Sequence, residues 1–267
     1  MKINTETKCA LIGSTGFVGS NLASQFRFDD KFNSSNISKI CNREYELVIC
    51  AGIQAKKWWS NQNEAEDLAG INRLLECLKT VTAKQFVLIS TVDVYPNPAG
   101  VDESSLIDIS SNHAYGKHRF MAEEYIRSHF ANHLVLRLPG LFGAGIKKNV
   151  IHDLLNNHEL EKINPEGVYQ YYFLDNLKAD IQRAQALGLE LLNISAEPVA
   201  TKDVVSRFFP DAKVGEASPF KASYDMKSLH WKEWGSTAPS YLYDQSTVLN
   251  QLQKFIETEL AATTKNC

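Results

Sequence analysis

Three glycines near the start of the chain are the residues whose type and spacing point most directly to a chemical role. Gly13, Gly16 and Gly19 stand three residues apart in the stretch K-C-A-L-I-G-S-T-G-F-V-G-S-N. Between a strand and a helix, the first glycine permits a tight turn, the second lets the backbone approach a pyrophosphate, and the third lets the helix pack closely. The N–H groups at the start of the helix then hold the anion. This context favours a dinucleotide site over a plain turn, which would also use glycines.

The residues on either side of these glycines supply the strand and the helix that such a site needs. Cys9 to Ile12 is a short apolar run, which is typical of a buried parallel strand. The segment from Phe17 to Phe26 is predicted to be a helix that packs on a sheet, with Leu22 on its apolar face. The predicted cofactor contacts at this turn are Gly13, Ser14, Thr15, Gly16, Phe17, Val18 and Gly19.

The end of the second predicted strand bears on which dinucleotide binds. An NAD-preferring site usually places an Asp or Glu about 20 residues beyond the glycines, where it holds the adenosine ribose. This chain offers Asn33 and Ser34 instead. A carboxylate would repel a 2′-phosphate and these neutral side chains would not, so the segment favours NADP over NAD. Alternatively, the stretch Asn-Ser-Ser-Asn is only a loop.

Further along, predicted strands and helices alternate. Ala51 and Gly52 end one of the strands with small residues, which let a flat ring or a phosphate come close. Strands are predicted at 46–52, 86–90, 134–138, 169–173 and 191–194, and helices at 65–80, 113–129, 151–160, 175–187, 202–209 and 243–260. The alternation predicts an α/β fold, a Rossmann-like doubly wound parallel sheet with a small C-terminal substrate lobe. One strand–helix unit between the first helix and residue 46 is predicted to be shortened or missing.

We expect the dinucleotide-binding domain to comprise residues 1–145, with 171–195 returning to it. Residues 146–170 and 196–267 are expected to form the smaller substrate-binding lobe. Two adjacent tryptophans, Trp58 and Trp59, cannot both point inward from a regular element. Either one of them lines a cleft or a subunit contact, or the segment is a loop folded onto the core.

Composition narrows the class of protein. The chain has 267 residues, of which 44% are hydrophobic, so it can build a substantial core. The net charge of −3 gives no reason to expect nucleic acid or an anionic membrane as a partner. The five cysteines, Cys267 among them, have no metal-ligand spacing, and their odd number suits a reducing cytoplasm. No run approaches the ~18 apolar residues of a membrane span.

Four landmarks follow one another along roughly the first two thirds of the chain. They are G-S-T-G-F-V-G at 13–19, S-T-V-D-V-Y at 90–95, Y-G-K-H-R at 115–119 and L-R-L-P-G-L-F-G at 136–143, with a fainter Y-F-L-D-N-L at 172–177. In these landmarks the sequence resembles the extended short-chain dehydrogenases/reductases, in the group of NAD-dependent sugar-nucleotide epimerases, dehydratases and reductases.

The resemblance implies a proton shuttle. Tyr115 takes the place of the family tyrosine that moves the hydroxyl proton, and Thr91, with Ser90 beside it, takes the place of its hydroxyl partner. The alternative for Tyr115 is an ordinary tyrosine at the start of a helix. Arg119 stands where the family has a lysine that lowers the pKa of the tyrosine and grips the nicotinamide ribose. The implied cofactor contacts add Ala51, Gly52, Ser90, Tyr115, Arg119 and Pro139 to those of the glycine turn.

The arginine at position 119 is the main departure from the family pattern. Arg119 shares a helix face with Tyr115, whereas Lys117 lies on the opposite side and cannot substitute. Lys117 and His118 are expected to be solvated. Arg119 keeps the positive charge and is expected to lower the pKa of the neighbouring phenol. We therefore expect Arg119→Lys to keep or raise activity.

Three further positions bear on the substrate. Asp93 lies two residues after Thr91, where family dehydratases have an acid that protonates a leaving hydroxyl; the alternative is a surface or capping aspartate. Gly140 stands where many members have an Asn that holds the sugar diphosphate, and Tyr169 where some have an Arg.

The resemblance implies an NAD(P)-dependent oxidoreductase or epimerase that acts on a sugar or sugar nucleotide, with reduction of a keto-sugar as the first choice. The alternative function, of a different class, is a catalytically weak or inactive NAD(P)-binding sensor or scaffold. The family often forms homodimers through the helices around Leu68 and Tyr115. A cytoplasmic location is expected.

Overall fold

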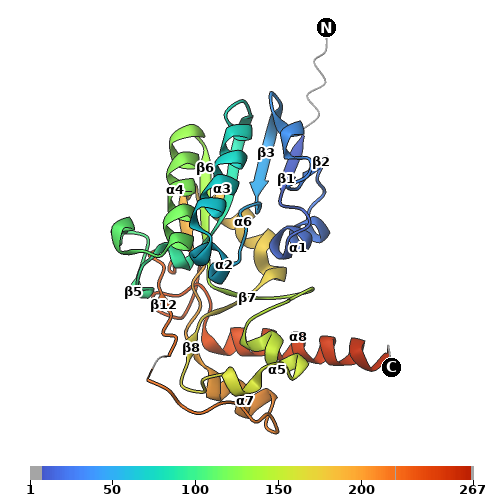
Figure 1. Cartoon of the computed structure of the whole chain (residues 1–267), viewed down its shortest axis with the longest axis vertical. Coiled ribbons are helices and arrows are strands. Elements are labelled where there is room, and N and C mark those ends of the chain that lie inside the picture. The colour runs from blue at the N-terminus through green and yellow to red at the C-terminus, as the bar shows by residue number, and fades with distance from the viewer. Residues whose placement is uncertain (1–7, 220, 266–267) are drawn as a thin grey trace. The chain divides into compact units, whose positions relative to one another are not determined.

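The computed structural model describes residues 8–219 and 221–265, and Cys267 lies outside this range. The chain divides into two compact units (Figure 1). Unit 1 comprises the described residues up to Asn97 together with Leu106–Arg137 and Leu177–Leu192. Unit 2 comprises Pro98–Ser105, Leu138–Asn176 and the described residues from Asn193 onward.

A six-stranded parallel sheet forms the centre of unit 1. Its spatial order is β10-β6-β4-β3-β1-β2. The strands are β1 (Cys9–Ile12), β2 (Asp30–Phe32), β3 (Glu44–Cys50), β4 (Thr82–Thr91), β6 (His133–Leu138) and β10 (Leu191–Asn193). The chain crosses over at β1 and continues outward on both sides, which is the doubly wound order. The predicted fold class is thus confirmed.

Helices cover both faces of this sheet. In Figure 1, α3 (Glu64–Leu78) and α4 (Ala114–His129) lie in front of the strands, and α6 (Leu177–Ala186) lies behind them. The short α2 (Lys57–Gln62) contacts α3 and α4, and α1 (Phe17–Gln25) contacts α6. Between β2 and β3 the chain makes only a 3₁₀ turn, η1 (Ile37–Ile40), which confirms the predicted shortening.

The core of unit 1 is continuous because its central strands are apolar on both faces. Val48, Phe86 and Val135 are fully buried, and the ring of Phe86 stacks on that of Phe130 at 4.2 Å. Each such side chain contributes about 1.5–3 kcal/mol through burial. This core fixes the carboxyl ends of β1, β3 and β4, from which the site residues project.

Unit 2 has its own core and short strand pairs. Its strands are β5 (Ala99–Val101), β7 (Gly140–Phe142), β8 (Val168–Tyr169), β9 (Tyr171–Phe173), β11 (Val199–Ala200) and β12 (Asp225–Met226), and its helices are α5 (Val150–Asn156), α7 (Thr201–Phe208) and α8 (Gln245–Lys265). The ring of Phe142 stacks on that of Phe173 at 5.0 Å and contacts Phe255 of α8. Over the described residues, no helix has both the length and the apolar character needed to cross a bilayer.

Two local predictions in unit 2 were wrong. The single strand expected at 169–173 is split at Gln170, whose buried amide nitrogen donates to the carbonyl of Met226 at 2.7 Å. The helix expected at 202–209 begins one residue earlier: Thr201 is the first residue of α7, and its hydroxyl donates to the carbonyl of Gly167 at 2.9 Å. In both cases a long-range hydrogen bond overrides the local pattern.

Candidate active site

The glycine turn joins β1 to α1 in a conformation that only small residues allow. Gly13 has φ of +86°, and a Cβ at this position would lie 2.3 Å from the carbonyl oxygen of Ala51. Its N–H donates to the carbonyl of Phe32 at 2.8 Å, which ties the turn to the end of β2. The turn is therefore pinned between β2 and β3 at the carboxyl edge of the sheet.

Gly19 and Gly16 differ in what surrounds them. A Cβ on Gly19 would lie 2.0 Å from the carbonyl oxygen of Gly13, so the first turn of α1 is pressed against the glycine loop. Gly16 is exposed, and a Cβ there would meet only the oxygen of Gly13, at 3.3 Å. Gly16 precedes α1, and no side chain caps this helix. The uncapped N–H groups of α1 therefore lie beside an open backbone, as an anion site requires.

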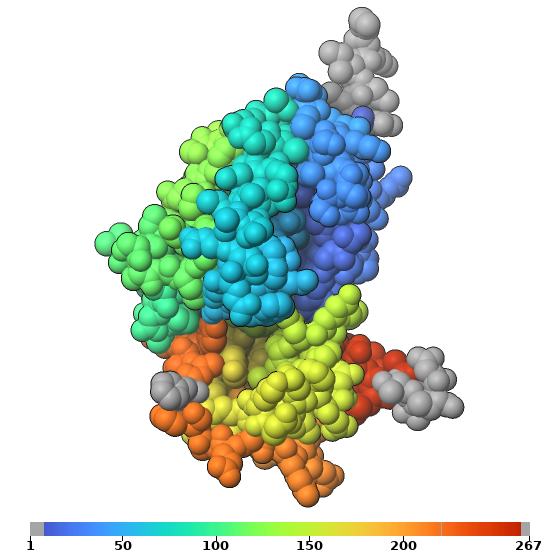
Figure 2. All heavy atoms as spheres, viewed as in Figure 1, coloured from blue at the N-terminus to red at the C-terminus, as the bar shows by residue number. Residues whose placement is uncertain are grey.

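A cavity of about 450 Å³ adjoins this turn, and we call it the nucleotide cavity. It lies in the hollow between the blue first 50 residues and the cyan α2–α3 segment in Figure 2. Its lining residues are Ile12, Gly13, Asn33, Ser34, Ile37, Gly52, Ile53, Gln54, Trp59, Glu66, Asp67, Gly70, Ile71, Arg73 and Leu74. Glycines and branched apolar side chains make a slot suited to a flat ring. Trp59 lines it while Trp58 is 63% exposed, so one tryptophan does line a cleft.

The segment after β2 forms a self-bonded turn. The side-chain oxygen of Asn33 accepts hydrogen bonds from the backbone N–H of Ser35 at 2.9 Å and from its hydroxyl at 2.6 Å. The hydroxyl of Ser14 donates to the carbonyl of Phe32 at 3.2 Å. Asn33 and Ser34 line the nucleotide cavity, and Ser34 also lines a second cavity, described next.

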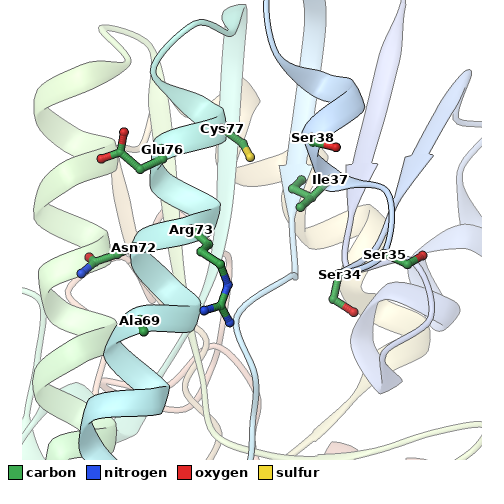
Figure 3. Close-up of a pocket in the computed structure, with 9 residues that line it drawn as sticks. All are labelled: Ser34, Ser35, Ile37, Ser38, Ala69, Asn72, Arg73, Glu76 and Cys77. Atoms are coloured by element: carbon green, nitrogen blue, oxygen red, sulfur yellow. The ribbon is translucent and has the colours of Figure 1, made fainter.

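A second cavity of about 600 Å³ continues beyond Ser34, and we call it the outer cavity. It shares Ser34, Ile37 and Arg73 with the nucleotide cavity. Figure 3 shows Ser34, Ser35 and Ser38 of the β2–η1 segment on one side of it and the lining residues of α3 on the other.

Tyr115 lies at the start of α4 and is 7% exposed. Its backbone N–H donates to the side-chain oxygen of Asn61 at 2.9 Å. The guanidinium of Arg119, one helical turn later, lies over the phenol ring with its Cζ 3.9 Å from the ring centroid. The two residues therefore share a helix face, as predicted, and their contact is a cation–π stack.

Arg119 is fixed from several sides. Its Nη1 lies 2.5 Å from Oδ2 of Asp67, and its Nη2 lies 2.9 Å from Oδ1 of the same carboxylate. Nη2 also donates to the carbonyl of Gln54 and, at 3.4 Å, to the hydroxyl of Ser60. Arg119 is 3% exposed, and Asp67 is 4% exposed. We call Arg119, Asp67, Ser60 and Gln54 the arginine clamp.

The electrostatics of the clamp differ from what a lone cation would give. Burial raises the pKa of Tyr115 above its ordinary value of 10; Arg119 opposes this shift, Asp93 adds to it, and the hydrogen bond with Thr91 opposes it. Arg119 thus lowers the pKa of the phenol, as expected, but burial outweighs this contribution and the net shift is upward. Burial would also raise the pKa of Asp67, but hydrogen bonds from Arg119, His118 and Ser60 hold it below 3.8.

The nucleotide cavity connects these two arrangements. It extends from Gly13 and Gly52 at the glycine turn to Gln54 and Asp67 of the clamp. A model of the NAD dependent epimerase/dehydratase family matches residues 9–179, which is well over half of the chain.

The chain belongs to the NAD dependent epimerase/dehydratase family.

Solved structures of this fold match almost the whole chain at low identity. A dTDP-4-dehydrorhamnose reductase from Bacillus anthracis, in complex with NADP, is 15% identical with a TM-score of 0.70, covering 94% of this chain and 98% of that chain. An NDP-hexosamine 5,6-dehydratase of tunicamycin biosynthesis is 15% identical with a TM-score of 0.73, covering 94% and 97%. A UDP-glucuronic acid 4-epimerase from Bacillus cereus, in complex with NAD, is 15% identical with a TM-score of 0.65, covering 94% and 99%. No curated protein sequence matches the chain.

The family's hydroxyl positions lie on β4 with different partners. Ser90 is buried and donates to Oε1 of Glu123 at 2.5 Å, and Glu123 in turn binds Arg137. Thr91 accepts the N–H of Asp93 at 3.2 Å and interacts with Tyr115. The structure thus brings Thr91, but not the hydroxyl of Ser90, to the phenol.

Asp93 has a cationic partner. Nζ of Lys57 lies 2.8 Å from its Oδ1, and the Asp93 side chain is 16% exposed. Burial and the charge of Lys57 lower the pKa of His113, which caps α4 by accepting the N–H of Gly116 at 3.0 Å. Lys57, on α2, therefore joins the candidate site, although it belongs to no motif that marks it in the sequence.

His118 was expected to be solvated, and this was wrong. It is 1% exposed, and its Nδ1 lies 2.7 Å from Oδ2 of Asp67. Lys117 is half-buried, with Nζ 3.9 Å from Glu64. The unrecognised residue was Asp67: it lies on the same face of α3 as the buried Ile71, Leu74 and Leu78. A carboxylate on an apolar helix face needs a buried partner, and that was the available signal.

Three predicted positions belong to unit 2. Gly140 donates its N–H to the carbonyl of Gln170 at 3.0 Å, and a Cβ there would lie 2.9 Å from the same oxygen. A side chain at the family's asparagine position would therefore crowd the backbone. Tyr169 stacks on Tyr224 at 5.9 Å, and Pro139 is buried.

Proposed function

We propose that the protein is an NAD(P)-dependent oxidoreductase of sugar nucleotides, with reduction of a keto-sugar as its reaction. The observation that carries this proposal is the nucleotide cavity, which joins the glycine turn to the clamp that holds Tyr115. Gly13 of the glycine turn and Gln54 and Asp67 of the clamp line this cavity. The buried phenol of Tyr115 lies against Arg119 of the clamp. Relatives of the same fold are a reductase, a dehydratase and an epimerase of nucleotide sugars.

The residues present fit a pyridine dinucleotide. The turn from Gly13 to Gly19, with Ala51 and Gly52, would hold its diphosphate, and the slot beside Ile37 would take its adenine. When bound, the nicotinamide supplies or accepts a hydride. Because no carboxylate follows β2 before Cys41, we favour NADP over NAD.

Tyr115 would move the proton. Its phenol donates to a carbonyl oxygen as that oxygen becomes a hydroxyl, and Thr91 holds the same oxygen. Proton transfer of this kind is worth about 10²–10⁴ in rate. Arg119 keeps the phenol ring in place through the stack, and Asp67 keeps Arg119 in place. In this proposal Arg119 orients the phenol, and the net pKa of the phenol stays above its ordinary value.

A second candidate rests on the same clamp. Nη1 and Nη2 of Arg119 are both engaged by the protein, so the family lysine's grip on the ribose has no evident replacement at this position. A protein of this kind could bind the dinucleotide and turn over slowly, as a sensor or scaffold would.

The test separates binding from turnover. We expect NADPH fluorescence to change on titration with the protein, and NADPH to be consumed with dTDP-4-dehydrorhamnose or another 4-keto-sugar nucleotide. Tyr115→Phe should bind NADPH as before and lose turnover by about 10²-fold or more. Binding without turnover across the keto-sugars would favour the sensor. Turnover untouched by Tyr115→Phe would refute the mechanism.

A homodimer through the helices around Leu68 and Tyr115 is part of the same proposal. Sedimentation of the purified protein at micromolar concentration would distinguish a dimer from a monomer.

A further inference from the structure

An arginine, Arg73, lines both cavities. Arg73 is exposed on α3, and in the part of the chain that the structure describes it has no ion-pair partner. Its Nη2 lies 3.7 Å from the point that a Cβ on Gly70 would occupy, so the guanidinium lies along α3 over Gly70, which itself lines the nucleotide cavity. In Figure 3 the Arg73 side chain runs along α3, with its guanidinium on the side of the helix that faces the segment carrying Ser34.

The acidic groups around Arg73 are compensated or distant. Glu76 lines the outer cavity, but Nζ of Lys79 lies 2.6 Å from its Oε1. Asp67 is paired with Arg119. Glu66 is seven residues before Arg73, which is about 10 Å along the helix. The local charge therefore favours an anionic ligand.

The opposite wall supplies small polar side chains and no carboxylate. Ser34 lines both cavities, and Ser35 and Ser38 line the outer one. The nearest acid before this segment, Asp30, accepts hydrogen bonds from Arg43 at 2.8 Å and from the hydroxyl of Tyr45 at 2.8 Å. An anion between Ser34 and Arg73 would thus meet the Ser34 hydroxyl on one side and a guanidinium on the other. The Ser35 hydroxyl already donates to Asn33.

We propose that Arg73 binds the 2′-phosphate of NADP(H) and makes the protein select NADP(H) over NAD(H). This proposal rests on the proposed function. The adenosine would occupy the slot beside Ile37, which both cavities share, and this would bring its ribose to the boundary at Ser34. The selecting charge would come from α3, because the segment after β2 carries only neutral side chains at Asn33 and Ser34. A guanidinium offers a fork of donors that matches phosphate oxygens.

Calorimetric titration with NADPH, NADH, 2′,5′-ADP and 5′-AMP tests the proposal without a turnover assay. Each pair of ligands differs only at the 2′ position. We expect the phosphorylated ligand of each pair to bind about tenfold to a hundredfold more tightly. Arg73→Gln should remove most of that ratio and leave the NADH and 5′-AMP affinities unchanged. Arg73→Lys should keep part of it, since it keeps the charge but not the fork.

Lys39→Gln is the matched control. Lys39 is an exposed cation on η1, close in sequence to Ile37, and lines neither cavity. It should leave all four affinities unchanged. The preference of the wild type should also weaken below about pH 6, where the 2′-phosphate dianion takes up a proton and loses one of its two negative charges.

The outcomes separate the two proposals. Equal affinity for NADPH and NADH, tighter binding of NADH, or an equal loss for both ligands in Arg73→Gln would overturn the role of Arg73 while leaving the dinucleotide site intact. An equal loss would point to contact with the adenine face instead. If none of the four ligands binds at millimolar concentration, the proposed function fails and this inference fails with it.

Discussion

Two arginines of unit 1 occupy opposite situations along the same cavity. Arg119 is 3% exposed, and Asp67, Ser60 and the carbonyl of Gln54 bind its guanidinium. Arg73 is exposed and carries no ion pair within the described part of the chain. The first is part of the fold, and the second is available to a ligand.

The sequence pointed to Arg119 as the cation that contacts the cofactor, whereas this difference points to Arg73. The family pattern draws attention to position 119, and no motif marks position 73. A cation already paired with a buried carboxylate has little left for a ligand, whereas an unpaired one beside a cavity has all of its donors.

Asp67→Asn should have the largest effect because it leaves a buried guanidinium without its counter-ion. We expect the free energy of unfolding in urea at pH 7 to fall by about 3–5 kcal/mol. The pKa of Asp67 is held below 3.8, so its contribution is present above that value and is lost as the pH falls through the depressed pKa. The gap between wild type and variant should therefore narrow below about pH 4. A loss under about 1 kcal/mol at pH 7 would contradict the clamp.

Gly13→Ala and Gly16→Ala form a matched pair with different expected results. A methyl group on Gly13 would lie 2.3 Å from the oxygen of Ala51 at a φ of +86°, so we expect destabilisation by about 2 kcal/mol or more. Gly16 has φ of −77°, and a Cβ there would meet only the oxygen of Gly13, at 3.3 Å, so Gly16→Ala should cost far less stability than Gly13→Ala and lose affinity for NADPH. Thermal unfolding and NADPH fluorescence separate the two outcomes. Normal NADPH binding by Gly16→Ala would place the diphosphate elsewhere.

Arg119→Lys should unfold more easily, whatever it does to turnover. A lysine cannot span both oxygens of Asp67 and reach the carbonyl of Gln54 as the guanidinium does. We expect a loss of about 1–3 kcal/mol in urea unfolding. Lys117→Arg on the same helix is a suitable control, because Lys117 makes only a 3.9 Å contact with Glu64. A variant as stable as the wild type would show that the charge, not the fork, is what the clamp needs.

The smallest effect on stability is expected for Arg73→Gln. An exposed side chain without a protein partner contributes little, so the free energy of unfolding without ligand should stay within about 0.5 kcal/mol of the wild type. Circular dichroism melts measure it. A clear destabilisation would mean that Arg73 supports the fold. Any loss of NADPH affinity in Arg73→Gln would then reflect the damaged fold and not a lost contact with the 2′-phosphate.

The sequence predicted the frame of the molecule because the frame depends on local pattern. Glycine spacing, apolar runs and the Tyr115–Arg119 interval are all short-range features, and they placed β1, α1, β3, α3 and α4 within a few residues. The clamp was not predicted because Asp67 and Arg119 are 52 residues apart in the sequence. His118 was wrongly expected to be solvated for the same reason, since its partner is also Asp67. The contact between Lys57 and Asp93, which are 36 residues apart, was not predicted either. Only the apolar face of α3 around Asp67 carried a hint.

The central claim is that the glycine turn binds a pyridine dinucleotide, and one titration tests it most directly. NADPH is titrated into the wild type and into Gly16→Ala at equal protein concentration, with nucleotide fluorescence as the signal. The account predicts saturable binding to the wild type with Kd below about 1 mM and a much weaker response from the variant. Absence of NADPH and NADH binding to the wild type at millimolar concentration would contradict it.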